Sequence, residues 1–168
     1  MALKQSMATL TRPANTTTYT AGDVVSNDAA TGVALVFAGV VRGTNGNGSV
    51  ALATLVDSAN QTLKGDFELW LFNTAPVAVN DNLPLAITDI ALGALVTVIK
   101  FPVAGALVSN LGVGADGNVT YFGVPASGAP DAVIFTKKTS RDLFGVVVVR
   151  NAYVPIASST LRFTLSIE

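Results

Sequence analysis

The sequence contains neither cysteine nor histidine. Without cysteine, the chain can form no disulfide and no thiolate metal site. Without histidine, it lacks the commonest general base and the commonest zinc ligand, and mechanisms that pair serine or cysteine with histidine are excluded. These absences remove much of enzyme chemistry, and we expect a protein that is not an enzyme.

Charge is also scarce. Charged residues make up 12% of the 168 residues, about half of the roughly 25% that is usual, whereas hydrophobic residues reach 50%. A surface with few charges suits a large permanent interface, because charges buried there must be paired or desolvated at a cost. We therefore expect a homo-oligomer, a dimer or a trimer. The net charge of −1 provides no basic stripe, so we expect no nucleic-acid partner.

Long hydrophobic runs are missing as well. The longest apolar stretches, residues 33–41 and 144–149, are much shorter than the roughly 18 to 20 residues that cross a bilayer as a helix. The first ten residues, MALKQSMATL, lack the continuous apolar core of a secretory signal. We expect no membrane partner and no export by that route.

The main pattern in the sequence is an alternation of apolar and polar side chains, with a period of two residues. Residues 161–167 alternate apolar and polar side chains, which predicts a strand with one buried face. Residues 33–41 and 146–149 are apolar at successive positions, which predicts strands covered on both faces, the second cover being available to a partner. Further strands are expected at residues 3–10, 18–25, 50–56, 67–72, 95–101, 119–122 and 132–136.

Clusters of Gly, Pro, Asn and Ser separate these strands. No linker and no repeat of fixed period divides the chain, which indicates a single domain. About ten short strands predict an all-β fold, a jelly-roll-like antiparallel β-sandwich over residues 12–168. Residues 1–11 are expected to form an N-terminal arm or an edge strand. One helical turn is expected at residues 88–92, capped by Thr88 and ended by Gly93.

The acidic residues near loops are Asp23, Asp28, Asp81, Asp89 and Asp116. They lack the short, regular spacing of a calcium loop, and Asp commonly accepts backbone hydrogen bonds in turns. We therefore expect no metal and no cofactor, and we expect single Asp→Asn changes in loops to be tolerated. A glycosidase would need two carboxylates that meet in a cleft, an alternative that the sequence leaves open.

Two segments are candidates for contact with a partner. The N-terminal segment, with Leu3, Lys4, Met7 and Leu10, precedes Pro13, which interrupts strand pairing, so this segment can add as a strand to a neighbouring subunit. A basic cluster follows the predicted strand at 132–136 and is either a solvated hairpin or a docking patch for an acidic surface. Its members are Lys137, Lys138 and Arg141.

Aromatic residues support an alternative function. Trp70 lies in an apolar alternation that favours core packing, but an exposed tryptophan also stacks on sugars. A glycan-binding module of a virion surface or tail would use such residues in its loops. The candidates for that role are Tyr19, Trp70, Tyr121 and Tyr153.

Three motifs carry a resemblance to a known family: RPANTTTYTAGDVV at residues 12–25, ELWLFN at 68–73 and NDN at 80–82. Over about residues 9–102 the chain resembles head decoration (cement) proteins of tailed bacteriophages. The resemblance implies a jelly-roll-like fold, homo-oligomers and no catalytic residues. It also implies binding across major capsid protein subunits on the outer surface of the virion, after assembly in the host cytoplasm.

Overall fold

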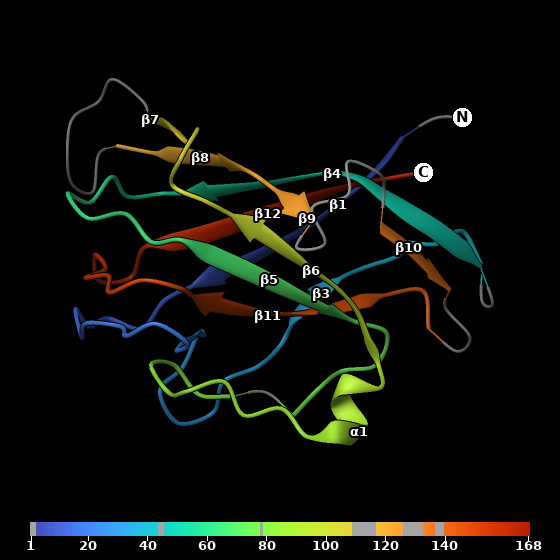
Figure 1. The fold of residues 1–168 in the computed structure, drawn as a ribbon, viewed down its shortest axis with the longest axis horizontal. Helices are drawn as coiled ribbons and strands as arrows, with labels where there is room; N and C mark the ends of the chain where they lie inside the picture. The colour runs from blue at the N-terminus through green and yellow to red at the C-terminus, as the bar shows by residue number, and fades with distance from the viewer. Residues whose placement is uncertain (1–2, 44–45, 78, 109–116, 126–132, 137–139) are drawn as a thin grey trace.

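The computed structural model describes residues 3–43, 46–77, 79–108, 117–125, 133–136 and 140–168, which fold into two packed β-sheets (Figure 1). The first sheet has the order β1-β12-β4-β8-β7, and β10 also pairs with β4. Its strands are β1 (Lys4–Thr11), β4 (Asn47–Asp57), β7 (Leu107–Val108), β8 (Val119–Phe122), β10 (Val133–Thr136) and β12 (Thr160–Ile167).

The second sheet has the order β2-β11-β5-β6-β9, and β3 also pairs with β11. Its strands are β2 (Val24–Val25), β3 (Leu35–Phe37), β5 (Phe67–Phe72), β6 (Leu95–Phe101), β9 (Val124–Pro125) and β11 (Leu143–Val149). All of the pairings in both sheets are antiparallel.

The strand order is that of a jelly roll. If β2 and β3 are taken as two halves of one position beside β11, and the short strands β7, β9 and β10 are left out, eight main strands remain along the chain. The first sheet then runs first, eighth, third, sixth, and the second sheet runs second, seventh, fourth, fifth. This arrangement interleaves the two ends of the chain, as the double Greek key of a jelly roll does. The predicted all-β, jelly-roll-like sandwich is confirmed.

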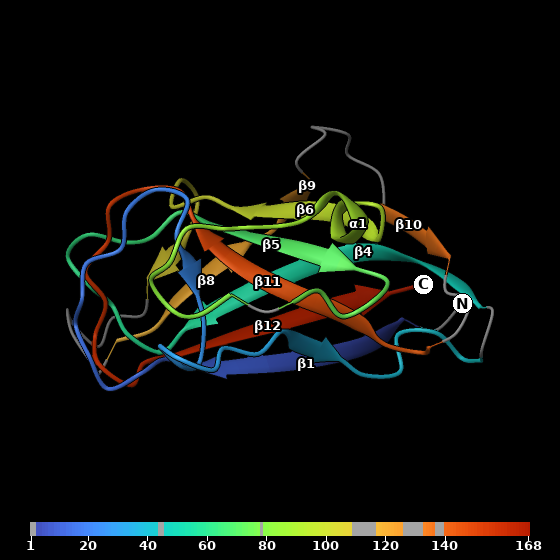
Figure 2. The same ribbon diagram turned by 90° about the horizontal axis from the view of Figure 1, so that it is seen from below.

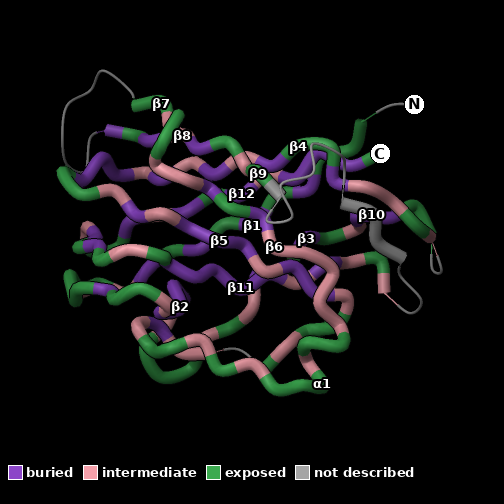
Figure 3. Tube along the Cα trace, in the orientation of Figure 1, coloured by how far each residue is buried: buried purple, intermediate pink, exposed green. Residues whose placement is uncertain are grey.

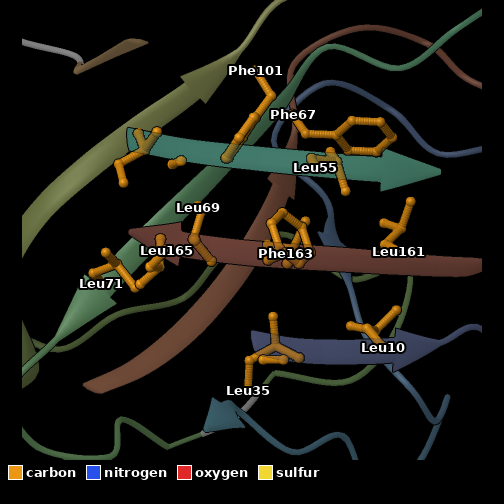
Figure 4. Close-up of a cluster of buried hydrophobic side chains, with 14 of the residues drawn as sticks. Leu10, Leu35, Leu55, Phe67, Leu69, Leu71, Phe101, Leu161, Phe163 and Leu165 are labelled. Carbon is orange, nitrogen blue, oxygen red and sulfur yellow. The ribbon is translucent and has the colours of Figure 1, made fainter. Parts of the chain in front are cut away.

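The core lies between the two sheets, where alternate residues of each strand meet (Figure 4). Leu55 and Phe163 enter from the first sheet, and Leu69 and Phe101 enter from the second, all without solvent exposure. The rings of Phe101 and Phe163 meet edge to face with centroids 5.7 Å apart. Buried positions are concentrated along β5, β11 and β12 (Figure 3). In β12, the apolar positions 161, 163, 165 and 167 are all buried, as the alternation in residues 161–167 predicts.

Strand β11 is apolar on both faces because the chain covers it twice. Val147 and Val149 point into the core, whereas Val146 and Val148 point outward and join a second apolar cluster. That cluster includes Leu85, from the segment at residues 73–94, described except at position 78, which crosses the outer face of the second sheet together with α1 (Figure 2). The second cover is therefore supplied by this chain, and a partner is not needed for it.

The helix α1 (Asp89–Leu92) forms where the sequence predicts it. The Thr88 hydroxyl accepts a hydrogen bond of 3.3 Å from the amide of Ala91, and Gly93 follows as the C-cap. Within the described residues, no helix is long and apolar enough to cross a membrane.

Two predicted strands are much shorter than expected. Of residues 18–25 only β2 is a strand, and of residues 33–41 only β3 is one. Gly22 and Gly39 adopt φ angles of +101° and +60°, so the backbone turns at both positions instead of extending. The two-residue strands β7 and β9 are too short to give a periodic signal, and the sequence did not predict them.

The N-terminal segment is an edge strand of the first sheet. β1 pairs with β12 along its whole length, from Lys4 opposite Ile167 to Thr11 opposite Thr160. Its inward side chains, Ala8 and Leu10, belong to the main core. Of the two alternatives for residues 1–11, the structure contains the edge strand.

Candidate functional site

The outer face of the first sheet is open to solvent. Strand pairing places Met7, Thr164, Thr54 and Phe122 in one row across β1, β12, β4 and β8. Large apolar side chains stand on this face, with exposed fractions of 63% for Met7, 49% for Leu52 and 46% for Phe122. This open face is defined here by its outward residues, which are Gln5, Met7, Thr9, Thr11, Leu52, Thr54, Val56, Thr120, Phe122, Arg162, Thr164 and Ser166.

The open face carries very little charge. Arg162 is the one charged residue among its twelve members, and Thr is the commonest residue. Exposed large apolar side chains together with very few charges are features of interaction surfaces. The outer face of the second sheet is covered over β5 and β11 by apolar side chains that include Val79, Leu85 and Ile87. The open face is therefore the candidate docking surface.

The structure separates the predicted contact residues on β1. Leu3 and Met7 are exposed, whereas Leu10 is 3% exposed and lies in the core. Alternation along β1 sends Leu10 to the face opposite that of Met7, so Leu10 is not available to a partner. Lys4 is exposed, and its ammonium group donates to the carbonyl of Gly39.

The basic cluster is described only at Arg141, because Lys137 and Lys138 lie outside the described residues. Arg141 is exposed, and its Nε donates to the carbonyl of Val41 at 3.1 Å. Arg141 and Lys4 therefore both bind the loop that follows β3, one at Val41 and the other at Gly39.

A buried polar network lies inside the domain, and the sequence did not predict it. The Tyr19 hydroxyl donates to Asp81 Oδ1 at 2.6 Å and accepts from Arg12 Nε at 2.7 Å. Asp81 Oδ1 also accepts from the Ser26 amide at 2.8 Å, and Asp81 Oδ2 lies 3.8 Å from Arg12 Nη2. The Arg12 and Asp81 side chains are 0% and 1% exposed, so this ion pair is screened from water.

A second set of polar groups adjoins the network through ring stacking. Tyr19 stacks on Tyr153 with centroids 5.7 Å apart, and the Tyr153 hydroxyl accepts from Gln61 Nε2 at 2.9 Å. Asp57 is fully buried, and its Oδ1 accepts from the Ala59 amide at 3.0 Å. Burial raises the pKa of Asp57 to about 7, against the opposing effects of the Ala59 amide, Gln61 and Arg12.

The network is closed to substrates. Arg12, Tyr19, Asp57, Asp81 and Tyr153 are all at most 4% exposed. Burial raises the pKa of the Tyr19 hydroxyl, and its hydrogen bond to Asp81 raises it further, which makes this group a poor proton donor to a substrate. Such a set of groups can hold loops together and respond to pH, but it has no open side on which to bind a ligand.

The predicted turn role of the loop carboxylates holds for two of them. Asp23 Oδ2 accepts from the amide and the hydroxyl of Thr20, and Asp28 Oδ1 accepts from the amides of Ala30 and Thr31. The Ala30 and Thr31 amides lower the pKa of Asp28. Within the described part of the chain, no group of three or more acidic side chains is placed to hold a metal ion.

The prediction for Asp81 was wrong, because its carboxylate is a buried ion-pair member and not only a turn residue. Asp89 lies in the first turn of α1. Asp116 lies outside the described residues.

Trp70 packs outside the main core. It is half-buried and joins the second apolar cluster on the outer face of β5. Its Nε1 donates to Glu68 Oε2 at 3.0 Å, and the same oxygen accepts from Arg150 Nη2 at 2.6 Å. The predicted apolar packing of Trp70 is therefore present, but it occurs against the covering segment and not between the sheets. Tyr19, Tyr121 and Tyr153 are fully buried.

No known protein family, curated protein or solved structure matches this chain.

Proposed function

We propose that the protein is a non-enzymatic structural protein of a virion, which decorates and stabilises a tailed-phage capsid by binding across major capsid protein subunits. The observation that carries the proposal is the open face of the first sheet, where Met7, Leu52 and Phe122 are exposed and Arg162 is the one charged member. The resemblance of residues 9–102 to decoration proteins supplies the identity of the partner.

The size of the open face favours a subunit that makes several contacts. Four strands about 4.8 Å apart and about 24 Å long form roughly 450 Å² of flat sheet. A stable interface of standard size takes about 800 Å² from each partner. One open face is therefore a weak docking site by itself. Contacts with two capsid subunits at once would act at high effective concentration and hold the neighbouring capsid proteins together.

The placement of the polar and aromatic groups also favours a structural role. Of the loop carboxylates that a glycosidase could use, Asp23 and Asp28 are held in turns and Asp81 is closed in the buried network. Three of the four aromatics that a glycan-binding module would use are fully buried, and the indole N–H of the fourth is bound to Glu68. This placement favours the capsid-decoration proposal over the glycan-binding alternative.

The test is co-sedimentation with undecorated heads of the phage that encodes the chain. Leu52→Lys places a charge in the middle of the open face and should lower the affinity for heads at least tenfold, because a buried charge without a partner is costly. Ile90→Lys is the matched control, since Ile90 is exposed on α1, away from the open face. Failure of the unmodified protein to bind heads, or equal binding by Leu52→Lys, would overturn the proposal.

A further inference from the structure

The outer edge of β1 is an unpaired strand edge. β1 has eight residues and pairs with β12 on one side, and no described strand pairs with it on the other side. The backbone N–H and C=O groups on that side are therefore a template for another strand. Proteins usually protect such an edge with charges, proline or a bulge. Lys4 is the one charged residue of β1, it stands at the strand end, and its ammonium group is bound to Gly39.

A groove of about 360 Å³ follows this edge. One wall is β1 from Met7 to Leu10, and the other is formed by Asn27 and residues 33–36, which lead into β3 of the opposite sheet. Val33 and Val36 are 61% and 48% exposed, and no residue that lines the groove is charged. An occupant must therefore complete backbone hydrogen bonds and cover apolar side chains, and it needs no charge of its own.

We propose that the occupant is a second copy of this chain, with the two β1 strands paired antiparallel about a twofold axis. In such an isologous contact each residue near the axis meets its own symmetry mate, so a charge there would repel itself. An edge and groove free of charge away from the strand end meets this requirement. Antiparallel pairing of two identical edges closes after two subunits, so the assembly is a dimer and not a trimer.

Side-chain alternation restricts the register. In an antiparallel pair, two residues that lie opposite each other point to the same face of the sheet. The outward residues of β1 are all odd-numbered, so each residue must pair with one whose number is odd when its own is odd and even when its own is even. The central choices are Met7 opposite Met7 or Ala8 opposite Ala8. The first choice brings the two Met7 side chains, each 63% exposed, into contact across the axis, whereas the second places Met7 opposite Thr9. The register centred on Met7 is therefore the favoured one.

The dimer also changes the area available for docking. A twofold axis perpendicular to the sheet leaves the open faces of both copies on the same side, so they form one continuous surface of about 900 Å². This area reaches the size of a standard interface, which a single copy does not. The dimer thus deepens the proposed function by naming the unit that meets the capsid, but its existence does not depend on capsid binding.

The mass of the full-length chain in solution tests the stoichiometry. We expect sedimentation at micromolar concentration to give twice the 17.2 kDa chain mass. Met7→Lys should convert the dimer to a monomer, because it places two like charges at the axis. Leu52→Lys is the control, since Leu52 lies on β4 away from the edge, and this variant should remain a dimer. An unmodified monomer or trimer would overturn the inference, as would a dimer that Met7→Lys leaves intact.

A disulfide tests the register without relying on weakened association. The chain has no cysteine, so Met7→Cys introduces the one thiol, and mild oxidation should link two copies through position 7. Thr9→Cys is the matched control on the same face of β1, and it should not cross-link, because symmetry mates at position 9 lie about 13 Å apart along the strands. No cross-link through Met7→Cys, or equal cross-linking through Thr9→Cys, contradicts the register.

The same variants separate this inference from the proposed function. A Met7→Cys dimer that does not bind heads would leave the dimer standing and overturn capsid binding. An unmodified monomer that binds heads would show that a single copy of the chain is the unit that meets the capsid. That outcome would overturn the dimer and leave capsid binding standing.

Discussion

The Tyr19 hydroxyl donates a hydrogen bond of 2.6 Å to Asp81 Oδ1 and thereby joins two residues that are 62 positions apart in the chain. Arg12 lies over the ring of Tyr19, with its guanidinium carbon 4.8 Å from the centroid, and also pairs with Asp81. The carboxylate therefore ties the segment after β1 and the segment before β2 to the covering segment at residues 73–94. A change at Asp81 should act on stability, not on chemistry.

Asp81→Asn should destabilise the fold. The amide keeps one acceptor oxygen for Tyr19 but removes the charge that compensates Arg12. Loss of one partner of a buried ion pair costs about 3–5 kcal/mol, and the retained hydrogen bonds place the expected effect at or below the lower end of that range. Urea unfolding of this variant and of Asp28→Asn, a half-buried turn residue, provides the comparison. Equal unfolding midpoints for the two variants would show that the pair contributes nothing.

Asp57 should make the stability depend on pH. Burial raises the pKa of its carboxyl from 3.8 to about 7, so the folded chain holds this proton more tightly than the unfolded chain does. The resulting stabilisation is fully present below pH 3.8 and is lost as the pH rises through about 7. A tenfold difference in proton affinity corresponds to about 1.4 kcal/mol, so the loss from Asp57 should amount to a few kcal/mol.

The measurement is the free energy of unfolding at pH 5 and at pH 8. Asp57→Asn should reduce the difference between the two values, since the amide does not titrate. Asp28→Asn should leave the difference as it is in the unmodified protein, because the amides that bind Asp28 lower the pKa of that carboxyl. If Asp57→Asn keeps the full difference, another group must be the source of the pH dependence.

Removal of residues 1–10 should lower the melting temperature, because β1 belongs to the domain's own sheet. The shortened chain loses nearly the whole ladder with β12 and the buried side chains of Ala8 and Leu10. Burial of one leucine contributes about 1.5–3 kcal/mol, so the loss should be large. Thermal unfolding of the two chains measures it, and an unchanged melting temperature would mean that the segment acts as a free arm.

The fold class could be predicted from the sequence because the features that determine it are local. Alternation and turn residues act over a few positions, and β5, β6 and β8 have the predicted bounds. The buried network was missed because Arg12 and Asp81 are brought together only by the tertiary fold, whereas NDN at 80–82 resembles an ordinary turn. Leu10 was grouped with Met7 by position in the chain, although strand alternation places the two side chains on opposite faces.

The sequence pattern also could not show which part of the structure covers each sheet face. The apolar outward residues of β11 indicated a cover, but only the fold shows that residues 73–94 supply it, since Leu85 and Val148 are far apart in the chain. The sequence did not indicate the open face of the first sheet, because strand pairing brings its outward residues together from four separate strands.

Gly145 provides a direct test of how tightly the sheets pack. It points inward from β11, and a Cβ added there would lie 2.8 Å from Leu69 Cδ1 and 3.1 Å from Phe37 Cε2. Both neighbours are fully buried, so neither can move into solvent. Overpacking of this kind typically costs about 1–3 kcal/mol, and Gly145→Ala should lower the free energy of unfolding by that amount. Gly43→Ala is the control, because nothing lies within 4 Å of the added atom, and its effect should be much smaller. If the two variants unfold at the same urea concentration, the two sheets have more room at β11 than the structure indicates.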